Sequence, residues 1–95
     1  MEKIEIQNVG QPGKTYRVDR AKFDEMRRAV LLCLPAEPPG ITPAELIAAT
    51  KEILDPTLFP GGETAGWWVK SVHLDLEAKG LLKRGPKSPV RLWRV

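Results

Sequence analysis

Apolar residues recur at helical spacing in three stretches of the chain. The first runs from Asp19 to Leu34. Its apolar side chains form one stripe that would face a core: Phe23, Met26, Val30, Cys33 and Leu34. Asp19 can cap the start of this helix, and Pro35 would stop it. We therefore predict a helix over residues 19–34.

The second helical stretch carries a strong start signal. Thr42 can act as the N-cap, Pro43 takes the first helical position and Glu45 the third. Ile41 is placed to pack against Leu46 across the start of the helix. This helix is expected to run to about residue 54, where an Asp-Pro pair ends it.

A loop and a third helix follow. Two prolines and a Gly-Gly pair predict an irregular loop of about nine residues, with Leu58 and Phe59 turned into the core. Thr64 can cap a helix over residues 65–79, and Gly80 is placed for a left-handed C-terminal cap. Val69, Val72 and Leu76 share the face of this helix that we expect to be buried.

Short extended segments flank the helices. Ile4 and Ile6 alternate with polar residues, and we expect residues 1–18 to form an extended N-terminal arm. Residues 81–84 and 90–94 are extended around a tip that contains two prolines, which predicts a two-stranded hairpin. The sequence thus predicts an α+β fold with a three-helix core, a C-terminal hairpin and a short arm.

The end of the third helix and the hairpin resemble the recognition helix and wing of winged-helix proteins. The likeness is carried by Leu76-Glu77-Ala78-Lys79-Gly80-Leu81-Leu82-Lys83-Arg84 and the basic hairpin after it. The start of our predicted second helix resembles that of the second helix of the same fold, through Ile41-Thr42-Pro43-Ala44-Glu45-Leu46. The resemblance implies one winged-helix domain over residues 1–95, with the arm over 1–18 and the helical core and wing over 19–95. Many bacterial transcription regulators have this fold, so it also implies DNA binding.

A closer likeness rests on two further motifs. Leu58-Phe59-Pro60-Gly61-Gly62 and Gly66-Trp67-Trp68 make the chain similar to an uncharacterised family of small stand-alone bacterial proteins. This second resemblance implies no function. The long loop at 55–63 also departs from DNA-binding helix-turn-helix units, whose helices are joined by about 3–4 residues. It either reorients the third helix or is a packed insertion, and whether it blocks the face of that helix is left open.

Basic residues are concentrated at the C-terminal end. The chain carries 15 Lys and Arg against 12 Asp and Glu, a net charge of +3. Five basic residues follow Leu82 with no acid among them: Lys83, Arg84, Lys87, Arg91 and Arg94. A basic wing predicts contacts with the phosphates of double-stranded DNA, with Lys70 and Ser71 at the major groove. The same charges would equally keep a terminal hairpin from pairing with other strand edges.

An alternative function is a protein-interaction or homodimer module. Trp67 and Leu74 are expected on the outward face of the third helix, where they cannot make the bidentate contacts that read bases. Together with Trp93 they are candidate interface residues, because tryptophans are favoured anchors. The N-terminal arm could instead cover Trp67 or Leu74.

Catalysis, metal binding and membrane insertion find little support. We interpret Asp75 and Glu77 as solvated helix charges, and no nucleophile-base or phosphate-loop motif accompanies them. Cys33 and His73 are too few for a zinc site, and His73 is expected to be a half-buried packing residue. We expect no enzyme activity, no cofactor, no metal and no membrane span, and a cytoplasmic location.

Overall fold

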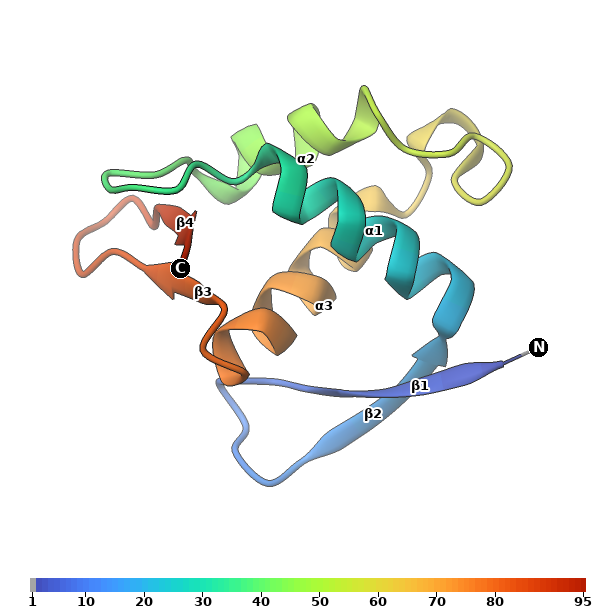
Figure 1. Cartoon of the computed structure of the whole chain (residues 1–95), viewed down its shortest axis with the longest axis horizontal. Helices are drawn as coiled ribbons and strands as arrows, with labels where there is room; N and C mark the ends of the chain where they lie inside the picture. The colour runs from blue at the N-terminus through green and yellow to red at the C-terminus, as the bar shows by residue number, and fades with distance from the viewer. Residues whose placement is uncertain (1) are drawn as a thin grey trace.

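A computed structural model describes residues 2–95, whose arrangement Figure 1 shows. The elements are β1 (Lys3–Gln7), β2 (Thr15–Asp19), α1 (Arg20–Cys33), α2 (Pro43–Lys51), a 3-10 turn (Pro60–Gly62), α3 (Ala65–Ala78), β3 (Leu82–Arg84) and β4 (Leu92–Arg94). Helix α3 crosses the middle of the molecule, with α1 and α2 above it and the β1–β2 hairpin below (Figure 1). Residues 2–95 thus form an α+β fold with three α-helices and two two-stranded antiparallel sheets.

Three of the four helix caps that the sequence predicts are present in residues 2–95. The Asp19 carboxylate accepts a hydrogen bond from the backbone N–H of Ala21, at 2.9 Å. Thr42 and Glu45 form the reciprocal capping box, in which each side chain accepts from the backbone N–H of the other residue. Gly80 has the predicted left-handed backbone, with φ of 75°. These interactions explain why α1, α2 and α3 begin or end where they do.

Thr64 does not act as the predicted side-chain cap. It precedes α3, but its backbone is left-handed with φ of 61°, and its hydroxyl donates to the carbonyl of Glu63 instead. Two glycines with positive φ, Gly61 and Gly62, come just before it and turn the chain sharply into the helix. The geometry of this turn, and not a side-chain cap, sets the start of α3.

The N-terminal segment is a hairpin and not the extended arm that the sequence predicted. Strands β1 and β2 pair antiparallel, with Ile4 opposite Val18 and Ile6 opposite Tyr16. These four side chains share one face, on which Ile6 and Val18 are buried. The five residues of β2 carry too little periodicity to reveal this pairing. Met1, which the predicted arm included, lies outside the described residues.

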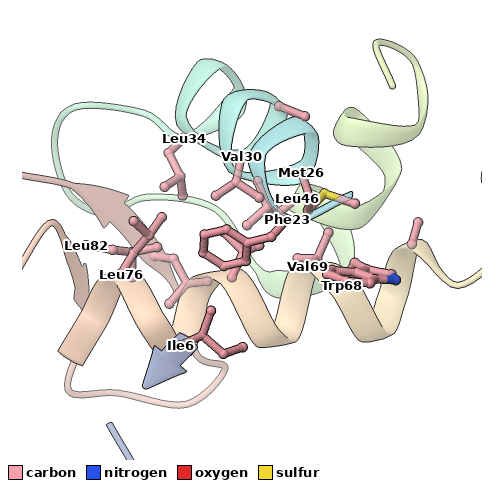
Figure 2. Close-up of a cluster of buried hydrophobic side chains, with 14 of the residues drawn as sticks. Ile6, Phe23, Met26, Val30, Leu34, Leu46, Trp68, Val69, Leu76 and Leu82 are labelled. Atoms are coloured by element: carbon pink, nitrogen blue, oxygen red, sulfur yellow. The ribbon is translucent and has the colours of Figure 1, made fainter. Parts of the chain in front are cut away.

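The core lies between α3 and the two other helices. Figure 2 shows Phe23, Met26 and Val30 from α1, and Leu34 just after it, meeting Val69 and Leu76 from α3. Leu46, Leu82 and Ile6 close the cluster. Phe59 of the loop packs edge-on against Trp68, with ring centroids 6.2 Å apart. The loop over 55–63 is therefore anchored in the core through Phe59, as predicted.

The predicted C-terminal hairpin is present and is joined by a third extended segment. Leu82 lies opposite Arg94, Lys83 opposite Trp93 and Arg84 opposite Leu92. Ile41 forms an isolated bridge to Leu92 through two backbone hydrogen bonds of 2.9 and 2.7 Å. This bridge fixes the hairpin against the segment that leads into α2.

Candidate nucleic-acid interface

The outward side chains of α3 form a ridge. We define the α3 ridge as Trp67, Lys70, Ser71 and Leu74, which follow one another at spacings of three, one and three residues. Trp67 is 57% exposed and Lys70 is exposed, whereas Ser71 and Leu74 are half-buried. The ridge is therefore open toward the N-terminal end of α3 and partly covered toward its C-terminal end.

The β1–β2 hairpin is what covers the C-terminal part of the ridge. The backbone N–H of Val9 donates to the carbonyl of Leu74 at 3.3 Å, and that of Gln7 donates to the carboxylate of Asp75 at 2.8 Å. The N-terminal segment thus lies over Leu74 and leaves Trp67 exposed. Of the two residues that the N-terminal arm could cover, it is therefore Leu74 that lies against the hairpin.

Two grooves run beside the ridge and share Lys70 and Leu74 as lining residues. The first has a volume of about 330 Å³ and lies between the ridge and the inner face of the β1–β2 hairpin. The second has a volume of about 360 Å³ and lies between α2, α3 and the C-terminal hairpin, with Arg84 and Val90 on its far wall. Among the described residues, none from 55–63 lines either groove. The long loop is a packed insertion that leaves the ridge accessible.

Arg84 is held by an ion pair with Glu77. Its guanidinium donates two hydrogen bonds to the Glu77 carboxylate, from Nε at 3.1 Å and from Nη2 at 2.8 Å. The hydrogen bond to Glu77 raises the pKa of Arg84. The same carboxylate also lies 3.0 Å from Nδ1 of His73. Arg84 therefore links β3 to α3, and its charge is already balanced.

The other C-terminal cations lie in different surroundings. Arg94 shares the inner face of the hairpin with Leu82, and it lines a cavity at the end of α1 with Leu31. Arg91 donates to the carbonyl of Gly40 at 3.2 Å and lies 4.0 Å from Glu45. Among the residues that the sequence predicts to contact DNA, the lysines are Lys70, Lys83 and Lys87. All three are exposed, and they form no ion pair within residues 2–95.

A model of a family of unknown function, DUF6958, matches residues 3–92. The chain belongs to this family. No curated protein and no solved structure matches it. Family membership therefore covers almost the whole of the fold described above, including the α3 ridge and most of the C-terminal hairpin, but the DUF6958 description assigns no activity.

Asp75 is buried, which corrects the interpretation that it is a solvated helix charge. Its side chain is 0% exposed and accepts from the backbone of Gln7 and from Nζ of Lys79, each at 2.8 Å. The Lys79 partner, four residues on, was visible in the sequence as a helical ion pair. The partner that buries Asp75 is 68 residues away along the chain, so no local pattern could reveal it.

Glu77 and His73 are likewise more buried than the sequence indicated. The Glu77 side chain is only 9% exposed, because β3 brings Arg84 over it. His73 is buried and not half-buried, and burial lowers its pKa although the hydrogen bond to Glu77 opposes this shift. Both residues belong to the joint between α3 and the C-terminal hairpin.

Neither a metal-binding cluster nor a membrane-spanning helix is present in the described residues. Within residues 2–95, His, Cys, Asp and Glu side chains do not gather in groups of three or more that could hold a metal ion. In the same residues, none of the helices has the length and apolar character needed to cross a bilayer.

Proposed function

We propose that this protein binds double-stranded DNA as a winged-helix domain, with α3 directed at the major groove and the β3–β4 hairpin as the wing. The order of elements supports this proposal, because α2, α3 and a hairpin follow one another as in the fold that the sequence resembles. The Ile41 bridge to Leu92 supports it further, since it fixes the hairpin to the segment that leads into α2. A fixed wing can contact the backbone while α3 lies in the groove.

The observation that carries the proposal is the placement of three unpaired lysines. Lys70 lies on the α3 ridge, and Lys83 and Lys87 lie on the hairpin, with no ion pair to any of them within residues 2–95. Unpaired cations can bind phosphates without first breaking a salt bridge, and the released counterions drive association. Ser71 and Arg91 complete the proposed contact set.

Two of the arginines that the sequence predicts to contact DNA are not proposed as phosphate ligands. Arg84 holds the wing to α3 through Glu77 and acts as a positioning residue in this proposal. Arg94 lines the cavity at the end of α1 and is left out of the contact set. The ridge offers Lys70 and Ser71 as its polar groups, so we propose weak sequence preference and affinity that comes mainly from the DNA backbone.

Fluorescence anisotropy with a mixed-sequence duplex tests this proposal. About four phosphate contacts predict micromolar affinity at low salt and a slope of about −3.6 in a plot of log K against log salt concentration. The affinity should fall about 150-fold between roughly 50 and 200 mM salt. No binding at about 100 µM protein in 50 mM salt would refute duplex binding.

Charge-removal variants locate the contact surface. Lys70→Ala and Lys87→Ala should each flatten the salt slope by about 0.9, the contribution of one phosphate contact. Lys3→Ala is the matched control, because it removes the same charge from an exposed position on β1 at the N-terminal end of the chain. Equal effects of all three variants would mean that net charge, and not the ridge and wing, determines binding.

A second candidate function is self-association through Trp67, favoured by its 57% exposure. Leu74 lies partly under the β1–β2 hairpin, and Trp93 lies on β4 and not on α3. Sedimentation velocity of the wild type and Trp67→Ala tests this function. A monomer in both cases argues against a dimer through this face.

A further inference from the structure

The outer face of the C-terminal hairpin carries a tryptophan among cations. The register places Lys83 opposite Trp93, on the face that points away from the buried Leu82 and Leu92. The ladder continues beyond the strands, because the N–H of Gly85 donates to the carbonyl of Arg91 at 2.8 Å. Arg91 therefore precedes Trp93 by two positions on the same face.

A cavity opens beside this tryptophan. It has a volume of about 410 Å³ and lies between the Pro38–Pro39 turn and the tip of the hairpin, with Trp93, Lys87 and Arg91 among its lining residues. The size is within the range of about 300–1,000 Å³ that is usual for ligand sites. Among the described residues, none that lines the cavity is acidic. The cavity therefore combines an aromatic wall with positive charge.

Glycine at position 85 keeps one side of the indole clear. A Cβ atom there would lie 3.5 Å from Cζ3 of Trp93, in van der Waals contact with the ring. The neighbouring prolines on the 38–39 turn and at the hairpin tip give the cavity apolar walls. An aromatic ring in a shallow apolar cavity with cations around it suits a flat, anionic ligand.

We propose that Trp93, Lys83, Lys87 and Arg91, here called the Trp93 platform, bind single-stranded nucleic acid. An unpaired base stacks on the indole of Trp93, and the flanking phosphates bind the three cations. A base inside a duplex has neighbours on both faces, so only an unpaired base can reach the ring. Charge complementarity favours a nucleic acid over a second copy of this chain, whose own platform would bring like charges together.

The Trp93 platform and the proposed duplex-binding surface each contain a residue that the other lacks. Lys83, Lys87 and Arg91 serve both surfaces, but Lys70 belongs to the α3 ridge alone and Trp93 to the platform alone. Lys70→Ala therefore reports on duplex binding and Trp93→Ala on single-strand binding. Failure of one proposal leaves the other standing.

Anisotropy titrations at low salt with labelled oligo-dT, oligo-rU and a mixed duplex test the platform. Trp93→Ala should weaken binding of the single strands about 5- to 150-fold, the range that follows from losing one stacked base. Trp93→Phe keeps an aromatic face and should retain most of the affinity. Lys70→Ala should leave single-strand binding unchanged. Binding of oligo-dT and oligo-rU with similar affinity indicates that the 2′-hydroxyl is not read, and a preference for one identifies the natural class of strand.

A second readout does not depend on whether Trp93→Ala folds. Stacking of a base on Trp93 should quench the indole fluorescence of the wild type during the oligo-dT titration, and this quenching should disappear in Trp93→Phe. Quenching that persists in Trp93→Phe would overturn the proposal, because it would place the base elsewhere. Absence of single-strand binding by the wild type, equal loss of duplex and single-strand affinity in Trp93→Ala, or equal binding of polyglutamate would also overturn it.

Discussion

The buried carboxylate of Asp75 offers the sharpest test of how the N-terminal hairpin is held. Asp75 is fully buried on α3 and joins two neighbours that differ in exposure. It accepts from the backbone N–H of Gln7 on β1 and from the ammonium group of Lys79, which is 38% exposed. Replacing Asp75 with Ala removes both interactions and leaves the N–H of Gln7 without its partner.

The size of the effect follows from these two surroundings. A hydrogen bond to a charged acceptor contributes about 1.5–3 kcal/mol. The pair with the partly exposed Lys79 adds about 0–1 kcal/mol. Asp75→Ala should therefore lower the free energy of unfolding by roughly 2–4 kcal/mol. This is a large share of the roughly 5–14 kcal/mol expected for a domain of this length.

Urea unfolding followed by circular dichroism measures this loss. Asp75→Asn keeps an acceptor for Gln7 and should cost about 1 kcal/mol, the difference between a hydrogen bond to a charged acceptor and one to a neutral acceptor. Asp24→Ala is the matched control, because it makes the same change at an exposed position of α1. A loss below about 0.5 kcal/mol for Asp75→Ala, the range of ordinary surface substitutions, would refute the role assigned to this carboxylate.

Three further predictions concern the frame of the fold. Thr42→Ala should cost about 1 kcal/mol in urea unfolding, because the capping box of α2 is lost, and an unchanged midpoint would contradict it. Gly40→Ala should lower the free energy of unfolding by more than the roughly 1–2 kcal/mol of a left-handed backbone alone, because its Cβ would overlap the carbonyl oxygen of Leu92. Gly13→Ala is the control, because Gly13 has a similar φ of 86° but lies in open space. The lowered pKa of His73 means that the unfolded chain binds more protons below about pH 6.5. The free energy of unfolding should therefore fall from pH 7 to 5.5, less so in His73→Gln, and equal slopes would contradict the burial argument.

Local signals were sufficient for the helices and the C-terminal hairpin. The capping box at Thr42 and the left-handed glycine at position 80 are encoded within a few residues, and the structure confirms both. The apolar stripes of α1 and α3 likewise match the buried core in Figure 2. Helical periodicity repeats over many residues, so it survives without knowledge of tertiary partners.

Long-range contacts were beyond the reach of the sequence. The pairing of β1 with β2 and the burial of Asp75 both depend on segments that meet only in the folded chain. The same holds for Arg84, which was a candidate phosphate ligand until β3 placed it against Glu77. Charge runs show which residues are basic but not which are already paired, and that distinction removes Arg84 from the proposed contact set.

The measurement that tests the proposed function most directly is amide chemical-shift mapping by NMR during a titration with duplex DNA. Our proposal predicts that the largest shifts lie on the α3 ridge and the wing, around Lys70, Ser71, Lys83 and Lys87. Residues around Lys3 on β1 should remain unaffected. Shifts centred on the β1–β2 hairpin or on the exposed end of α1, or none at saturating duplex, would contradict DNA binding through α3 and the wing.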